Sequence, residues 1–101
     1  MKFEFNQRKS EANRGKHGIS LEKAATIWEQ ARVEVTARTV GEPRGMVIGK
    51  IKGKLYACIY TAREEAIQIV LCRRASKREV RLYNEHFKEA YEETDNDDRG
   101  V

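Results

Sequence analysis

The sequence contains few cysteines and histidines, two of each, and it has no long apolar run. Cys58 and Cys72 lie in apolar, strand-like segments without a Cys-x-x-Cys or Cys/His spacing around them. This pattern argues against a zinc site and predicts two buried free thiols, with no metal or other cofactor. No apolar stretch is long enough to span a bilayer, and no signal-peptide core is present. We therefore expect a cytoplasmic protein without a membrane partner.

Acidic residues are scarce outside the C-terminus. The 101 residues include 20 Lys and Arg against 16 Asp and Glu, a formal net charge of +4. Without residues 92–101, the chain has 19 cations against 11 anions. Such a surface favours a polyanionic ligand, although a basic surface also serves solubility alone. We expect one folded domain over residues 1–93 and an acidic, disordered tail over residues 94–101.

The first part of the chain predicts one strand and two helices. Residues 2–5 alternate between polar and apolar and read as a short strand. Asn6 is a suitable N-cap for a polar helix that ends near Gly15 or Gly18, and Ser20 caps a second helix. Four strand-like segments follow, at residues 33–37, 46–51, 55–61 and 66–72, with a turn signal at Lys52-Gly53-Lys54.

The last strand-like segment runs into a helix start. Ser76 and Glu79 have the spacing of a capping box, in which each side chain accepts from the other residue's backbone N–H. Val80, Tyr83 and Phe87 then repeat at helical spacing and predict an amphipathic helix. We predict an α+β fold, with an antiparallel sheet covered by helices in the order β-α-α-β-β-β-α.

The most basic part of the chain is this junction, residues 73–79. Backbone N–H groups at a helix N-terminus favour an anion, and guanidinium donors match phosphate oxygens. Lys77, Arg78 and Arg81 oppose the helix dipole, a cost that an anionic ligand offsets. The junction therefore predicts a phosphate site. A solvated charged face, with Glu79 acting purely as a cap, is the alternative interpretation.

Three further segments contribute candidate groups. Lys16 and His17 end the first helix; His suits proton transfer near neutral pH and Lys neutralises phosphate charge. Followed by glycine, the same pair is equally an ordinary helix stop. Arg63 closes the hairpin and is expected to reach the same sheet face as Arg73. Tyr83 is expected to pack its ring in the core, with its hydroxyl available to the basic junction.

Several short motifs follow one another in a specific order. They are Phe3-Glu4-Phe5-Asn6, the segment from Asn13 to Ala24, Arg44 and Gly49, Tyr60-Thr61-Ala62-Arg63, residues 73–79, and Tyr83. Together they resemble the BrnT toxin family over residues 3–90. The chain departs from the family pattern at Gln68, where an arginine is usual, and at Glu29-Gln30-Ala31, where Asp-Pro is common.

The resemblance implies a RelE-like fold and a toxin of a bacterial type II toxin–antitoxin pair. It implies a metal-independent endoribonuclease that cleaves RNA through the 2′-OH and arrests translation. The implied partner is a BrnA-like ribbon-helix-helix antitoxin, through which operator DNA is bound. The matched catalytic candidates are Arg73 and Arg63 as phosphate stabilisers, Lys16 as a neutralising cation, His17 for proton transfer, and Tyr83 and Glu79 as further candidates. RNA contacts are assigned to Arg74, Lys77, Arg78, Arg81 and Arg44.

Other functions fit the same residues. One is a non-catalytic nucleic-acid-binding module, or a degenerate toxin retained as a regulatory partner of the antitoxin. Another is a scaffold for the antitoxin without affinity for nucleic acid. RNA cleavage in EDTA that is lost in Arg73→Ala distinguishes the enzyme from the module, and a gel-shift measurement distinguishes the module from the scaffold.

Overall fold

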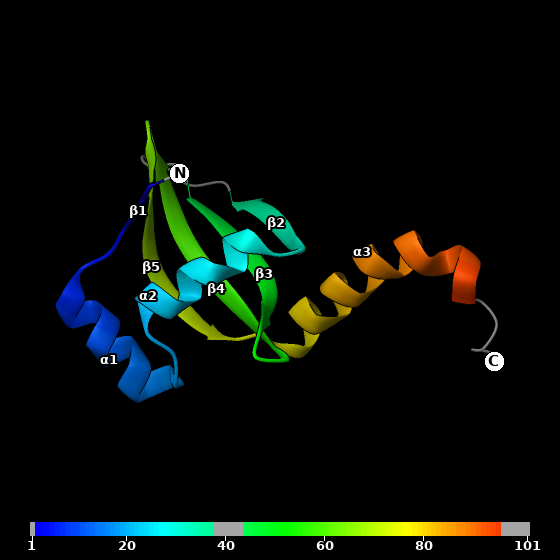
Figure 1. Ribbon diagram of the computed structural model, residues 1–101, viewed down its shortest axis with the longest axis horizontal. Helices are drawn as coiled ribbons and strands as arrows, with labels where there is room; N and C mark the ends of the chain where they lie inside the picture. Colours follow the sequence, from blue (N-terminus) through cyan, green and yellow to red (C-terminus); the bar gives the residue numbers. More distant parts are fainter. Residues whose placement is uncertain (1, 38–43, 96–101) are drawn as a thin grey trace.

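A five-stranded sheet forms the centre of the computed structural model, which describes residues 2–37 and 44–95. The strand order is β1-β5-β4-β3-β2 (Figure 1). The strands are β1 (Lys2–Glu4), β2 (Arg32–Ala37), β3 (Arg44–Ile51), β4 (Lys54–Arg63) and β5 (Ala66–Arg74). The helices are α1 (Gln7–His17), α2 (Leu21–Ala24), the 3₁₀ helix η1 (Ala25–Glu29) and α3 (Lys77–Asp95). α1, α2 and η1 lie over one face, and α3 projects from the end of β5 (Figure 1).

The α+β class is confirmed, but two features of the predicted sheet are wrong. All four segments expected to be extended after the helices are strands, so the chain has one strand more than the predicted order β-α-α-β-β-β-α. The sheet is also mixed, because β1 runs parallel to β5 while the other pairs are antiparallel. Alternation in a sequence indicates an extended segment, but it carries no information on the direction of a partner far along the chain.

The predicted helix starts are confirmed by their caps. Asn6 and Ser20 each accept a hydrogen bond from the backbone N–H three residues on, at 3.0 and 3.1 Å. α1 ends at Gly18, whose φ of 80° is a left-handed conformation that glycine adopts without strain. The second helix is shorter than expected because it tightens into η1. There Ile27 packs so closely on β3 that a β-carbon on Gly49 would lie 2.7 Å from it.

The face of the sheet that lies under α1, α2 and η1 contains the hydrophobic core, and we call it the helix-covered face. The buried core residues are Ile19, Leu21, Ala24, Ile27, Val47, Ile51, Cys58, Ile67, Ile69 and Cys72. Cys58 and Cys72 face each other across β4 and β5, and both are buried and free, as predicted. A hydrogen bond with Cys72 and burial raise the pKa of the Cys58 thiol. Cys58 is therefore a packing group and a poor nucleophile at neutral pH.

Asn13 joins α1 to the end of β5. Its side-chain amide donates to the backbone oxygens of Ile19 and Cys72 at 2.7 and 2.8 Å, and its oxygen accepts from the Cys72 N–H at 3.2 Å. β1 pairs with β5 from Ala66 to Gln68, near the start of β5. At Cys72, beyond that pairing, the Asn13 side chain takes the place of a neighbouring strand and satisfies the backbone N–H and oxygen. The contact places the basic last turn of α1 beside the end of β5.

A two-residue turn at Lys52 and Gly53 joins β3 to β4, as predicted. Their φ angles are 53° and 79°, and positive values at both positions are typical of a type I′ hairpin turn. Asn, Asp or Gly usually occupies the first position, and a left-handed conformation costs other residues roughly 1–2 kcal/mol. Within the described ranges, Lys52 is the one non-glycine residue with a positive φ.

The last helix is longer than the sequence suggested. α3 continues to Asp95, two residues into the segment predicted to be an acidic tail, and residues 96–101 of that segment lie outside the described residues. The stripe of Val80, Tyr83 and Phe87 is half-buried. No helix in the described part of the chain is long and apolar enough to cross a membrane.

Candidate functional site

Arg73 and Glu79 form a bidentate ion pair at the junction of β5 and α3. The guanidinium Nη1 donates to Oε1 at 2.8 Å, and Nη2 donates to Oε2 at 2.9 Å. The Ser76 N–H donates to the same carboxylate at 2.8 Å, and the Glu79 N–H donates to Ser76 Oγ at 3.2 Å. The predicted capping box is confirmed, with an arginine of the preceding strand added to it. A guanidinium is thus held in one orientation at a helix N-terminus.

Arg73 keeps donors for a further ligand. Arginine has five N–H donors, of which Glu79 and the Arg74 backbone oxygen occupy three, counting the described contacts. The side chain of Arg73 is 33% exposed and that of Glu79 is 13% exposed. The arginine is therefore open to solvent while its carboxylate partner is largely covered, an arrangement suited to binding a phosphate oxygen.

The ion pair also sets the protonation of Glu79. The hydrogen bond from Arg73, helped by Ser76, lowers the pKa of Glu79 to about 2, although burial opposes it. The same bond raises the pKa of Arg73. A carboxylate with so low a pKa is a poor general base at neutral pH. The geometry gives Glu79 the role of positioning Arg73.

The pKa of Glu79 leads to a prediction on acid stability. A lowered pKa in the folded state contributes stability that is complete above the unfolded value, 4.5, and that is lost as pH falls towards 2. We expect Glu79→Gln to lower the free energy of unfolding by about 1–2 kcal/mol at pH 7. The difference from the wild type should shrink below about pH 4.5 and largely disappear by about pH 2. Urea unfolding across this pH range measures it.

Glu85→Gln is the matched control for that measurement, because Glu85 is an exposed residue of the same helix. We expect its free energy of unfolding to stay within about 0.5 kcal/mol of the wild type at every pH. A constant difference between Glu79→Gln and the wild type from pH 7 to 3 would contradict the assignment of this carboxylate.

Arg73 and Arg74 point to opposite faces of the sheet, because consecutive strand residues alternate. Arg73 lies opposite Ala57 on the face away from α1, and Arg74 lies opposite Tyr56 on the helix-covered face. The Arg74 guanidinium carbon stands 5.7 Å from the centre of the Tyr56 ring, a cation–π contact. The predicted pair of arginines is therefore divided between two surfaces.

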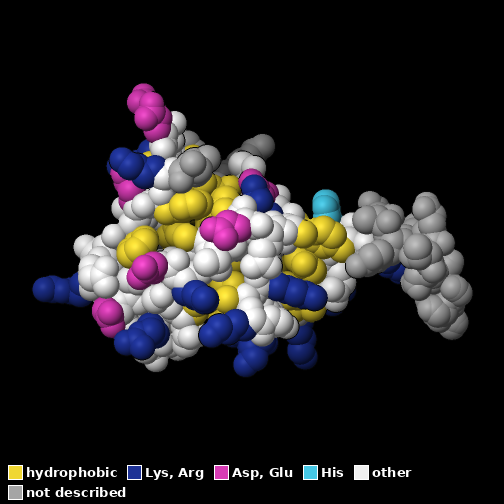
Figure 2. Space-filling model, viewed as in Figure 1, with side chains coloured by type: hydrophobic (Ala, Val, Ile, Leu, Met, Phe, Trp, Pro, Cys, Tyr) yellow, Lys and Arg dark blue, Asp and Glu magenta, His cyan; other side chains and the backbone are white. Residues whose placement is uncertain are grey.

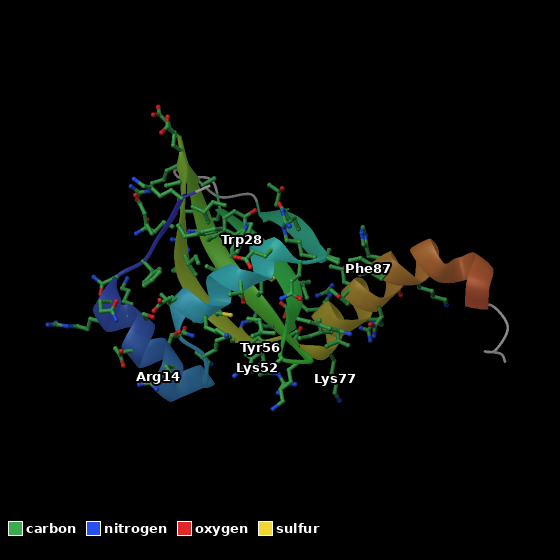
Figure 3. The ribbon with its side chains drawn as sticks, in the orientation of Figure 1. Arg14, Trp28, Lys52, Tyr56, Lys77 and Phe87 are labelled. Atoms are coloured by element: carbon green, nitrogen blue, oxygen red, sulfur yellow. The ribbon has the colours of Figure 1, made fainter. Side chains whose placement is uncertain are left out.

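A small basic hollow lies beside Arg74 on the helix-covered face. Its volume is about 150 Å³, and it is lined by Gly18, Ile19, Lys23, Ile51, Lys52, Lys54 and Tyr56. His17 immediately precedes one of these residues and is half-buried, whereas Lys16 is exposed. Figure 3 shows Lys52, Tyr56 and Lys77 at the same end of the sheet, and Figure 2 shows Lys and Arg side chains gathered along that edge. We call this edge the basic end.

A groove of about 450 Å³ lies between α3 and strands β2 and β3. Its lining combines Val35, Met46 and Leu82 with Arg78, Glu79, Arg81 and Glu85. Tyr83 lies one turn after Glu79, and its ring packs on Phe87 with 4.6 Å between ring centres. Because Arg78 and Arg81 line this groove, they lie on the Arg73 side of the sheet, apart from the basic hollow.

Arg63 and Arg44 do not join this basic end. By strand alternation Arg63 belongs to the same sheet face as Arg73, as expected, but it lies at the other end of that face. Arg63 pairs with Ala66 and Arg73 with Ala57, so the two arginines are about 20 Å apart along the strands. Arg63 donates to Gln68 at 2.7 Å, and Arg44 pairs with Thr61 nearby. Strand direction places the end of β4 beside the start of β5, and hence away from Arg73.

Sequence reasoning missed the residues of the hollow. The sequence indicates Lys52 and Lys54 as turn residues alone, and Lys23 and Tyr56 as parts of a helix and a strand. The available signal was the Lys-Gly-Lys turn, because a hairpin turn marks a sheet end. The Ala75 N–H donates to the Leu55 oxygen at 3.0 Å and brings this turn beside the β5–α3 junction. Within the described residues, no group of three or more His, Cys, Asp or Glu side chains is placed to hold a metal ion.

Comparison with known proteins identifies the class to which this fold and site belong. Residues 5–79 match a family model described as the ribonuclease toxin of type II toxin–antitoxin systems. The match includes α1, strands β2 to β5, and the junction as far as Glu79. The chain belongs to this family, the BrnT toxins, as the motifs of the sequence had indicated. No curated protein matches the chain.

Proposed function

We propose that this toxin is a metal-independent endoribonuclease of the cytoplasm, with a RelE-like fold, that cleaves RNA through its 2′-OH and arrests translation. The observation that carries the proposal is the Arg73–Glu79 pair at 2.8 and 2.9 Å, which holds a solvent-accessible guanidinium at a helix N-terminus. Attack by a 2′-oxygen puts additional negative charge on the phosphate. Donors fixed in advance towards such charge supply a large part of catalysis.

The proposed roles follow the placement of the side chains. RNA crosses the end of β5, where Arg73 binds the scissile phosphate and Glu79 keeps Arg73 in position. Lys16 and His17 approach from the helix-covered side, His17 as the proton-transfer group and Lys16 as a neutralising cation. Tyr83 is a further candidate for proton transfer, on the other face.

The RNA backbone is held by four further cations, which are Arg74, Lys77, Arg78 and Arg81. Arg63 and Arg44, at the far end, have no part in this proposal.

The partner we propose is a BrnA-like ribbon-helix-helix antitoxin that covers the toxin and binds operator DNA. Family membership supports an antitoxin partner in general. The non-catalytic module is kept as a second candidate function because the predicted groups do not all converge. Arg63 is distant, and Arg73 and Arg74 serve opposite faces.

Cleavage of single-stranded RNA in EDTA tests the proposal. We expect products that carry a 2′,3′-cyclic phosphate and a 5′-hydroxyl, because the 2′-oxygen displaces the 5′-oxygen. The same sequence with 2′-deoxy sugars should remain intact, and both substrates can be followed on denaturing gels. Growth arrest on expression, relieved by the cognate antitoxin, is expected as well. RNA binding without cleavage would support the module instead.

A further inference from the structure

The basic hollow has the composition of a site for part of a nucleotide. Three lysines and one aromatic ring line it, and no Asp or Glu occurs among its described lining residues. None of these lysines forms an ion pair with a described carboxylate. At about 150 Å³ it is smaller than the roughly 300–1,000 Å³ of pockets that enclose a whole drug-sized ligand. One base or phosphate of a longer chain fits it better than a free metabolite does.

Tyr56 and Arg74 provide a surface on which a base can stack. The tyrosine ring is half-buried against the core, and the guanidinium covers it at 5.7 Å. Single-stranded RNA is commonly bound by bases that stack on aromatic rings and on guanidinium planes, with lysines along the backbone. Lys23, Lys52 and Lys54 line the same hollow as Tyr56 and are exposed, so their ammonium groups are accessible to backbone phosphates.

The backbone of Lys52 is a second, independent observation. It has a φ of 53° at a turn position that Asn, Asp or Gly occupies more easily. A residue held in an unfavourable conformation is a reason to look for a function. Asparagine would suit this turn position better, and the lysine found there carries its ammonium group into the lining of the hollow.

We propose that the basic hollow is a subsite for single-stranded RNA, in which one base stacks on Tyr56 and Arg74 while Lys52, Lys54 and Lys23 bind adjacent phosphates. The inference rests on the proposed function in that the ligand is RNA. It goes further by placing a flanking nucleotide on the helix-covered face, next to His17, while the scissile phosphate lies at Arg73. The hollow then determines how tightly RNA is bound and in which register it is presented.

The test is anisotropy of a labelled 12-nucleotide RNA with 2′-O-methyl sugars, which cannot be cleaved through the 2′-OH, over a series of salt concentrations. Lys52→Asn is the decisive variant, because asparagine relieves the backbone and should raise the melting temperature. We expect weaker binding nevertheless, with the salt slope reduced by about 0.7 for one lost phosphate contact. A substitution that stabilises the fold and still weakens binding separates the part of Lys52 in the turn from its part in binding RNA.

Tyr56→Leu and Tyr56→Phe test the stacking surface. Leucine keeps apolar bulk without a ring, and we expect about tenfold weaker binding with an unchanged salt slope. Phenylalanine keeps the ring, and its affinity should stay close to that of the wild type. Lys2→Gln, an exposed cation at the far end of the sheet, is the control and should bind like the wild type. Circular dichroism verifies the folding of each variant.

The outcomes separate this inference from the ribonuclease proposal. Wild-type affinity in both Lys52→Asn and Tyr56→Leu overturns the subsite, even where the wild type cleaves unmodified RNA. Losses in these two variants, in a wild type that binds RNA without cleaving it, support the subsite and overturn the ribonuclease. Equal losses in Lys2→Gln, or no binding by the wild type, also overturn the subsite.

Discussion

Replacing Arg73 by alanine is expected to lower the rate of RNA cleavage by about 10²–10³-fold, the usual effect of removing one pre-positioned donor from a developing negative charge. Arg73 is the cation that a neighbouring carboxylate holds by two hydrogen bonds, at 2.8 and 2.9 Å, at the helix start. Single-turnover cleavage of a fluorogenic RNA with enzyme in excess measures the chemical step. Binding of the uncleavable 2′-O-methyl RNA should fall much less.

Two further variants make this result interpretable. Arg73→Lys keeps the charge but loses the fork that matches both a carboxylate and a phosphate, so we expect a rate between those of alanine and the wild type. Arg63→Ala removes the same side chain from the other end of the sheet, and cleavage should stay close to the wild type. Full activity in Arg73→Ala, or an equal loss in Arg63→Ala, would contradict the proposed site.

Replacing Asn13 by aspartate is expected to lower the free energy of unfolding by about 3 kcal/mol or more at pH 7. The change keeps the shape and removes both N–H donors, so that a buried carboxylate would face the backbone oxygens of Ile19 and Cys72. Asn13 is 7% exposed, so water cannot replace the lost partners. Urea unfolding followed by circular dichroism measures the effect.

The pH dependence of this variant has a definite sign. Burial among carbonyl oxygens raises the pKa of the introduced carboxyl above its unfolded value, so the folded state binds more protons and the variant gains stability as pH falls. Asn84→Asp, the same change at an exposed position of α3, is the control and should stay within about 0.5 kcal/mol of the wild type. Equal losses at the two positions would mean that the buried hydrogen bonds of Asn13 contribute little.

Local features of this chain could be predicted from sequence, and long-range ones could not. Helix caps at Asn6 and Ser20, the Ser76–Glu79 capping box and the Lys52-Gly53 turn depend on neighbours within three residues, and all are confirmed. The direction of β1 depends on a strand more than half the chain away, and it was predicted wrongly.

The candidate site shows the same division. The cluster at residues 73–79 is contiguous, so its cations could be recognised as one group. Whether Arg63 joins it depends on the register between β4 and β5, which places that residue at the opposite end. The hollow depends on the meeting of a hairpin turn, the two strands it joins, α2 and the connection between α1 and α2, and no single segment indicates it. The hydrogen bonds between Asn13 and Cys72, which span 59 residues, are likewise absent from any local pattern.

The uneven distribution of charge along the sheet has a consequence for the kinetics of encounter. Lysines and arginines crowd the basic end (Figure 2), whereas Glu4, Glu64 and Glu65 stand with Lys2 and Arg63 at the other end. A molecule with this polarity is turned by the field of a polyanion before the two surfaces touch. Successful collisions become more frequent without any gain in the lifetime of the complex. Added salt should therefore slow association with a polyanion before it affects the lifetime of the complex.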